Sequence, residues 1–318
     1  MPIISTPRGQ LRPNSGKSFK AITASGGITS DISWNGVSYR VHKFLNNGTF
    51  TVSDLGSGDP IELVMVGGGG SGGVDIGSGG GAGGLIDKLF IPSTTSYSLV
   101  IGAGGQSRPG TADDGPGYSG FNTTGFGLTA LGGAGGTGWQ NAGTPIGGSN
   151  PGTVNGGSGA GQSTSGPRTG TLNSQGRGTA TQPGSASGGY GNNGGFATPG
   201  FAGGGGGAGG PGGDGIYYSG VDGKAGDGGE GYFLNGRFGS GIGVNDYLAG
   251  GGAGGFDYVQ GLRSASVFTR NGTTKKLIET GEDSGPANTG SGGNGANHDN
   301  ENSGAGSSGI ILIRYRLS

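Results

Sequence analysis

Glycine-framed motifs are the first residues in this chain whose spacing could do chemistry. Gly67-x-Gly69-x-x-Gly72 follows an apolar run, as in a dinucleotide-binding fingerprint, where a helix N-terminus binds the pyrophosphate. Ser71 lies in Gly69-x-Ser71-x-Gly73, which has the spacing of a hydrolase nucleophile elbow. Both chemistries need a helix directly after the motif, and residues 74–79 (VDIGSG) have no helical pattern. We therefore expect neither a phosphate site nor a nucleophile here.

Acidic and histidine side chains give weaker signals. The segment Gly209–Tyr217 matches one nonapeptide of a calcium-binding β-roll, but a single copy cannot supply ligands from adjacent repeats. Asp113-Asp114, or Asp299 with Glu301, could act as paired catalytic carboxylates, although solvated loop charges explain them better. The chain has no cysteine and only two histidines. The sequence thus predicts no catalytic residue, no metal site and no cofactor, so we expect a protein that is not an enzyme.

Aromatic side chains are the stronger candidates for a binding site. Several stand among or beside small residues, where a ring can stack on a sugar or fill a receptor groove. The alternative is that each ring fastens a loop onto the glycine-rich part of the chain. As a set, we expect some of the rings to be displayed to a receptor. The candidates are Trp139, Tyr190, Tyr217, Tyr218, Tyr232, Phe233, Phe238 and Tyr247.

The composition limits what can position these side chains. Of 318 residues 89 are glycine, and only eight of those precede Gly67. An apolar fraction of 29% is too low for an ordinary core. A net charge of −1 and 24 aromatic residues nevertheless argue against disorder, and they give no reason to invoke nucleic acid. No apolar run approaches the roughly 18 residues of a membrane helix, and the start of the chain lacks a signal-peptide pattern. We expect synthesis in a cytoplasm.

The expected fold is all-β or non-regular, with short antiparallel strands around the glycine-rich region. We expect an N-terminal arm or attachment segment (1–20), a β-meander (21–60) and a glycine-rich domain (61–318) that strands 61–66 and 310–317 close. Within the meander, Asn35-Gly36 predicts a hairpin, because both turn positions need positive φ. Two more hairpins are expected, one from strands 85–91 and 97–101 and one at 266–278 around Asn271-Gly272.

The glycine runs predict packed polyglycine II-like helices. Each glycine costs about 1 kcal/mol in an α-helix interior, so no long helix is expected. Collagen is excluded because Leu262 to Asn271 contains no glycine. Extended left-handed helices have no internal hydrogen bonds, so every buried N–H and C=O must pair with a neighbouring helix. Only glycine lets the backbones approach closely enough, which explains whole runs such as Gly203 to Gly207.

Several ordered milestones give the chain a family resemblance. They are residues 41–52, 62–70, 81–85, 97–105 and 309–315 (VHKF to GTFTV, ELVMVGGGG, GAGGL, YSLVIGAGG and GIILIRY). From about residue 37 to 317 this pattern resembles the glycine-rich domain of bacteriophage virion proteins. In that family the domain occurs on tail fibres and fibre-tip adhesins, where tip loops on a polyglycine II bundle contact the host receptor. The family fixes no catalytic residue.

The resemblance implies a phage virion surface protein, synthesised in the host cytoplasm. Its partners would be other virion proteins, bound through the N-terminal segment, and a host-surface polysaccharide or outer-membrane protein. Loops within about 105–260 would form the recognition tips, and a homotrimer is the assembly usual for fibres. The alternative is a capsid decoration, head-fibre or collar protein with a structural role only. Nucleic-acid binding and membrane insertion are not expected.

Overall fold

The computed structural model describes residues 18–110, 115–139, 147–149, 153–164, 172, 174, 176–219, 222–257, 266–270, 274–278, 284–297 and 301–318. Within these residues the protein contains no helix, and hence none long and apolar enough to cross a membrane. The strands are β1 (Thr23–Ser25), β2 (Ile28–Trp34), β3 (Val37–Phe44), β4 (Gly48–Asp54), β5 (Ile61–Val66), β6 (Leu85–Phe90), β7 (Ser96–Leu99), β8 (Thr123–Gly125), β9 (Leu128–Ala130), β10 (Ile216–Ser219), β11 (Asp222–Lys224), β12 (Tyr232–Phe233), β13 (Tyr247–Leu248), β14 (Ser266–Arg270), β15 (Thr274–Ile278) and β16 (Ile310–Arg316). The expected all-β, non-regular fold class is confirmed.

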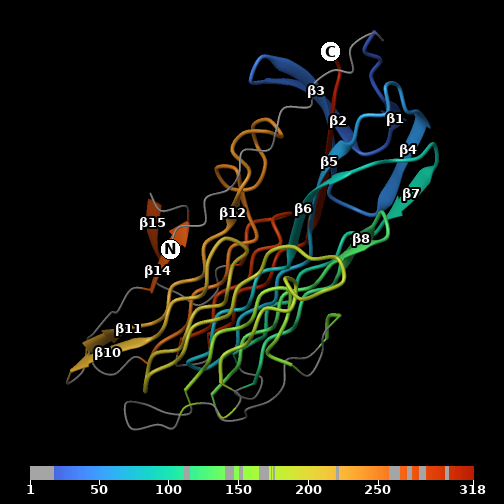
Figure 1. Ribbon diagram of the computed structural model, residues 1–318. Helices are drawn as coiled ribbons and strands as arrows, with labels where there is room; N and C mark the ends of the chain where they lie inside the picture. The colour runs from blue at the N-terminus through green and yellow to red at the C-terminus, as the bar shows by residue number, and fades with distance from the viewer. Residues whose placement is uncertain are drawn as a thin grey trace.

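A five-stranded antiparallel sheet in the order β2-β3-β16-β5-β6 lies at one end of the molecule (Figure 1). Its central strands, β5 and β16, pair from Ile310 opposite Val66 to Arg314 opposite Glu62, as the apolar runs predict. Both faces of this sheet are covered. One face packs against the three-stranded sheet β1-β4-β7, and the other against side chains from residues 234–249. This double burial explains why β5 is apolar at nearly every position.

Two of the expected strand pairings are wrong. The β2–β3 hairpin forms at Asn35-Gly36, with φ of 50° and 77°, but β4 does not continue the meander. It pairs instead with β1 and β7 in the second sheet, because β16 occupies the free edge of β3. The predicted hairpin at 85–101 is also split, since β6 pairs with β5 and β7 with β4. The predicted pairing within 266–278 is confirmed as β14 with β15.

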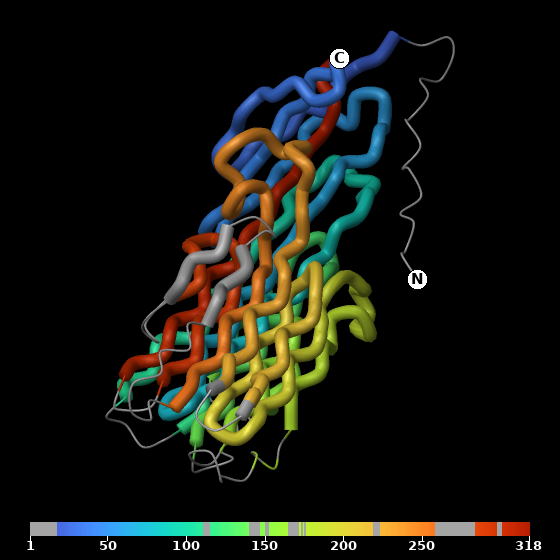
Figure 2. The backbone as a smooth tube through the Cα atoms, turned by 90° about the vertical axis from the view of Figure 1, so that its left-hand side faces the viewer, coloured from blue at the N-terminus to red at the C-terminus, as the bar shows by residue number. Residues whose placement is uncertain are grey.

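Below the sheets, extended glycine segments run side by side as a bundle (Figures 1 and 2). Segment 67–73 shows how they are joined. Gly67, Gly70 and Gly73 donate N–H bonds of 3.0, 2.9 and 3.0 Å to carbonyls of the adjacent segment, those of Gly84, Gly81 and Ser78. The intervening residues donate to other neighbours: Gly68 to Phe121, Gly69 to Ser307, Ser71 to Tyr118 and Gly72 to Gly304. A partner that changes with a period of three residues is the hydrogen-bond pattern of packed polyglycine II helices.

The same segment also accepts bonds from further neighbours. The carbonyls of Gly68, Gly69 and Gly70 accept from the N–H groups of Gly133, Gly105 and Gly293. At its glycine positions, a segment surrounded in this way has no room for a side chain. A Cβ on Gly70 would lie 2.0 Å from the carbonyl oxygen of Ala134, far inside the 3.4 Å at which ordinary contact begins. The glycine requirement is therefore steric, and it does not depend on positive φ, which the glycines of residues 67–73 do not adopt.

Side chains enter the bundle where they replace a backbone acceptor. Ser291, Asn294 and Asn297 stand three residues apart and face a segment that also advances in steps of three. The side-chain oxygens of these residues accept from the N–H groups of Gly250 (3.3 Å), Ala253 (2.9 Å) and Phe256 (3.2 Å), respectively. All three side chains are buried, so these bonds satisfy N–H groups inside the bundle. The period of three thus governs the polar side chains as well as the glycines.

Gly205 provides a direct test of this packing. Its N–H donates to Gly252 and its carbonyl accepts from Gly229, each at 2.8 Å, and an added Cβ would lie 2.0 Å from the carbonyl oxygen of Gly80. We expect Gly205→Val to push the segments apart and to orphan several buried groups, at about 1–3 kcal/mol each. Thermal unfolding and amide exchange measure the effect.

The matched control is Gly250→Ala, in the same bundle, where a new Cβ would meet nothing closer than 3.7 Å. We expect it to leave the melting temperature near that of the wild type. An unaltered melting temperature for Gly205→Val, with amide exchange at Gly203–Gly207 complete within seconds, would contradict the packed bundle.

His42 is buried between the two sheets at the end opposite the glycine bundle. Its Nδ1 lies 2.6 Å from the carbonyl oxygen of Gly26, and its Nε2 lies 3.1 Å from the hydroxyl of Tyr315. Because a carbonyl only accepts, the neutral ring carries its proton on Nδ1 and accepts from Tyr315. Burial lowers the pKa of His42, against the bond to Gly26, which favours the protonated ring.

The lowered pKa predicts a loss of stability in mild acid. The unfolded chain binds a proton at His42 near the ordinary pKa of 6.5, and the folded chain does so only at lower pH. The contribution of His42 is therefore fully present above about pH 6.5 and declines as the pH falls through the folded pKa. Urea midpoints measured from pH 8 to pH 5 should stay level down to about pH 6.5 and fall below it, and His42→Gln should flatten the decline. An equal decline in both proteins would rule out His42 as its source.

Candidate functional site

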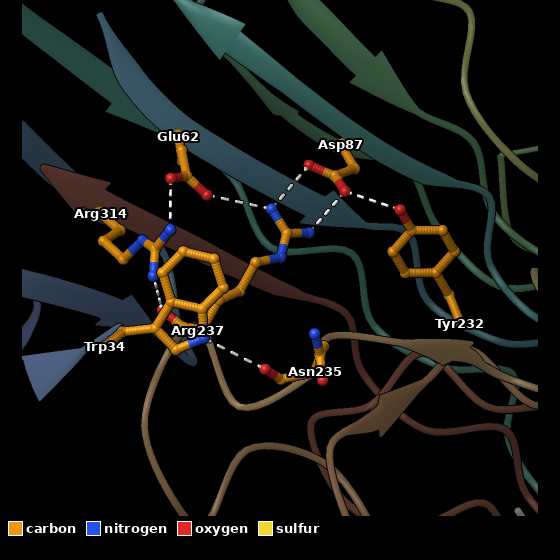
Figure 3. A network of polar contacts seen from close by, with 7 residues as sticks. All are labelled: Trp34, Glu62, Asp87, Tyr232, Asn235, Arg237 and Arg314. Atoms are coloured by element: carbon orange, nitrogen blue, oxygen red, sulfur yellow. Dashed lines mark hydrogen bonds and ion pairs between the residues drawn. The ribbon is translucent and has the colours of Figure 1, made fainter. Parts of the chain in front are cut away.

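A network of charged side chains joins the five-stranded sheet to residues 234–246 (Figure 3). Glu62 of β5, Asp87 of β6 and Arg314 of β16 project from the same sheet face, which Val64 and Leu312 also share. Strand alternation places these side chains on one face, because residues two apart point the same way. Together they form a polar strip along an otherwise apolar surface.

Arg314 is the most deeply buried member of the network, with 1% of the residue exposed. Its guanidinium pairs with Glu62 and donates to the backbone carbonyl of Arg237. The guanidinium carbon also lies 4.6 Å from the ring centre of Trp34 and 4.1 Å from that of Tyr39. An arginine can stack on rings and pair with a carboxylate at once because its donors lie in the guanidinium plane. Arg314 thus ties β2 and β3 to β5.

Arg237 completes the network from the opposite side. Its Nη1 lies 3.1 Å from Glu62 and 3.2 Å from Asp87, and its Nη2 pairs with the other oxygen of Asp87. The hydroxyl of Tyr232 donates to Asp87 at 2.7 Å. Burial, and next the charge of Asp87, raise the pKa of Tyr232, so its hydroxyl keeps its proton. Two arginines balance two carboxylates, and the result is a clamp that holds β12 against the sheet.

The clamp positions part of the predicted aromatic set. The ring of Tyr232 lies 4.8 Å from that of Tyr190, and Phe233 lies 4.8 Å from Tyr247, its partner across β12 and β13. Tyr190 and Phe233 are displayed, with 41% and 49% exposed, while Tyr232 and Tyr247 are partly buried. Phe238 is 2% exposed and packs in the core under this region. Its ring therefore fills the interior against the five-stranded sheet.

The remaining predicted rings lie elsewhere. Tyr217 and Tyr218 of β10 are 41% and 61% exposed, at the end of the bundle opposite the five-stranded sheet (Figure 1). Trp139 is partly buried at the last described residue of segment 131–139. The sequence-predicted set is thus divided between two ends of the molecule, and it does not form a single site.

The end that carries β10 also displays side chains that the sequence reasoning missed. We call this region the loop end and define it by β10, β11, the turn 196–201 and Arg177. Phe196 is 47% exposed and Ile216 is 42% exposed. The sequence could have indicated Phe196, because it follows Gly194-Gly195 and so stands beside small residues like the predicted aromatic candidates. Arg177 lies in Gly-Arg-Gly, and a pattern based on aromatic residues does not identify it.

Asp214 and the glycines of the motif 67–72 make structural hydrogen bonds. No group of His, Asp and Glu side chains among them could hold a metal ion. Asp214, the acid of the β-roll-like nonapeptide, accepts a hydrogen bond from the N–H of Phe196 at 2.7 Å. The N–H groups of Gly67, Gly69 and Gly72 are all used inside the bundle, so none of them is available to cradle a phosphate. The carboxylates proposed as catalytic pairs, Asp113-Asp114 and Asp299, lie outside the described residues.

Comparison with known proteins identifies a family. A family model described as a glycine-rich domain matches residues 45–316. No curated protein matches the chain. The matched range runs from the end of β3 to the last residue of β16, so it includes the bundle and the two strands that close it.

The clamp gives a stability prediction. Arg237→Met should leave Asp87 buried and without its cation, at a cost of about 3 kcal/mol in the free energy of unfolding. The double variant Arg237→Met with Asp87→Leu should recover part of this loss, since no charge is then stranded. Chemical denaturation followed by tryptophan fluorescence measures both. Lys20→Met, which removes the exposed pair with Asp54, is the control and should change stability little. Equal losses for Arg237→Met and Lys20→Met would contradict the clamp.

Proposed function

Because the chain belongs to the glycine-rich domain family, we propose that it is a bacteriophage virion surface protein that binds the host cell. In this proposal it is a tail-fibre or fibre-tip adhesin, the glycine bundle is a rigid scaffold, and the loop end contacts the receptor. The milestones that resemble phage virion proteins support the assignment to a virion. The N-terminal segment attaches the protein to other virion proteins, and fibres of this kind are homotrimers.

One observation carries the proposal that the loop end binds. Tyr218, Phe196 and Ile216 expose 61%, 47% and 42% of their surface at an end where the backbone is held by interlocked glycine segments. Exposing several large apolar side chains to water in one place is unfavourable, and such a group marks an interaction surface. The glycines of the packed segments have no room for a side chain, whereas the turns that join the segments do have room. A rigid frame with variable turns is the usual organisation of a recognition protein.

A second candidate is a capsid decoration, head-fibre or collar protein. Exposed apolar side chains away from the loop end favour it: Leu89 and Ile91 near the outer strand of the five-stranded sheet are 47% and 78% exposed. In that role these side chains would pack against other virion proteins. Immunogold labelling of intact particles separates the two, with label at fibre ends supporting adhesion and label on capsid lattice sites supporting decoration.

Cell binding by the purified full chain tests the leading proposal. We expect saturable binding to strains that the phage infects, and a reduction of about tenfold for Tyr218→Ser, because an interface aromatic contributes more than 1 kcal/mol. Phe233→Ser is the matched control, since Phe233 is similarly exposed but lies away from the loop end. Absence of binding to every susceptible strain would overturn the proposal. Equal losses for both variants would move the site away from the loop end.

A further inference from the structure

We propose that the loop end recognises an acidic saccharide, with Arg177 binding its carboxylate and the exposed faces of Phe196 and β10 packing on its sugar rings. This inference rests on the proposed function, which names the loop end but not the chemistry of its ligand. The elements that carry it are the ends of two neighbouring glycine segments and the start of β10.

Arg177 is held in place by its neighbours. Its guanidinium carbon lies 4.3 Å from the ring centre of Phe196, and its Nη1 lies 3.4 Å from the carbonyl oxygen of Gly194. The two segments are joined beside it, where the N–H of Gly194 donates to Gly178 at 3.1 Å. A guanidinium stacked on a ring keeps its in-plane N–H donors directed past the ring edge. Such a fork matches the geometry of a carboxylate.

The charge on Arg177 is not matched within the described residues. Arg40, Arg237 and Arg314 each pair with a carboxylate, and no such ion pair is formed by Arg177 among the residues that the structure describes. Two nearby acids are engaged elsewhere. Asp214 accepts from the backbone of Phe196, and Asp227 pairs with Lys224. An anionic group on a ligand would supply the missing partner.

Apolar faces lie directly beside this cation. The N–H of Gly215 donates to the carbonyl of Phe196 at 2.7 Å, which places the residue before β10 beside Phe196. Ile216 and Tyr217 point to opposite faces of β10, and Tyr217 turns toward Phe201, 6.5 Å away between ring centres. Tyr218 lies at an irregularity of the strand between Tyr217 and Ser219 and is 61% exposed. Sugar rings present C–H faces that pack on such side chains and hydroxyls that bond to tyrosine.

The size of the surface favours a saccharide over a protein receptor. A stable protein interface uses about 20–30 residues on each side. Among the described residues, the loop end offers one cation outside an ion pair, Arg177, and a few separate apolar side chains among glycines, which suits a ligand of a few sugar units. Combining C–H faces with a carboxylate is the property of acidic sugars, and neutral sugars would leave Arg177 without a partner.

An array of bacterial acidic polysaccharides, each beside its carboxyl-reduced form, tests the proposal. Reduction turns each carboxylate into a hydroxyl and leaves the ring faces unchanged. We expect the full chain to bind at least one acidic polysaccharide and to lose about tenfold in affinity when that glycan is reduced. Arg177→Gln should lose a similar factor on the acidic form and little on the reduced form, and Arg177→Lys should keep part of the affinity.

Arg316→Gln is the matched control. Arg316 also stacks on a phenylalanine, 4.7 Å from the ring centre of Phe19, but at the opposite end of the molecule. It should bind as the wild type does, and unchanged melting temperatures should show that each variant folds. Binding that ignores both carboxyl reduction and Arg177→Gln, or no binding to any acidic glycan, would overturn the inference.

Whole cells separate this failure from a failure of the proposed function. If the chain binds susceptible cells and Arg177→Gln binds equally well, the host-binding role stands and the acidic-saccharide inference falls. Loss of binding after protease treatment of the cells, with no effect of periodate on their glycans, would identify a protein receptor and likewise overturn it. If the chain binds no cells at all, both proposals fall.

Discussion

Extended segments can form backbone hydrogen bonds with neighbours on every side only where no Cβ holds those neighbours apart. Most of this protein is built from such bonds. Gly67, Gly70 and Gly73 bond to one neighbour while the residues between them bond to others. Each glycine loses more entropy on ordering than any other residue. The bundle offsets this cost by satisfying donors and acceptors that water would otherwise bind. The apolar fraction of the sequence is low because the interior of the bundle consists of backbone.

Such a bundle has only small hydrophobic clusters of its own to fix the register of its segments, such as Phe201 with Phe256, and the sheet end supplies a larger core. β5 leads into the first glycine segment and β16 follows the last, and the two strands pair side by side. Their side chains are buried on both faces, with Leu63 and Ile313 toward one sheet and Val64 and Leu312 toward residues 234–249. Arg314 and Arg237 then fasten those residues to the sheet. A slip of register in β16 would therefore displace both cores and the clamp together.

Local rules predicted the features that depend on neighbouring residues. The Asn-Gly turn predicted the β2–β3 hairpin, the continuous apolar runs predicted the central strands, and the glycine runs predicted the bundle. Pairing between distant strands was not predictable in the same way. The sequences of β4 and β7 do not indicate that these strands join a second sheet. Alternation of apolar and polar residues predicts a strand, but it does not identify the strand with which it pairs. The clamp was also missed, because Glu62, Asp87, Arg237 and Arg314 are far apart in sequence and meet only through topology.

The aromatic set is divided between two ends of the molecule for a related reason. A ring between glycines looks the same in sequence whether it closes a core, as Phe238 does, or projects from a hairpin, as Tyr218 does. What separates the two is the position of the residue along the bundle. Within the bundle a new Cβ meets a neighbouring carbonyl, and at the sheet end the space around Phe238 is filled by the clamp and its core. Large side chains can therefore vary freely only where the segments turn, and Arg177, Phe196 and β10 lie at such turns.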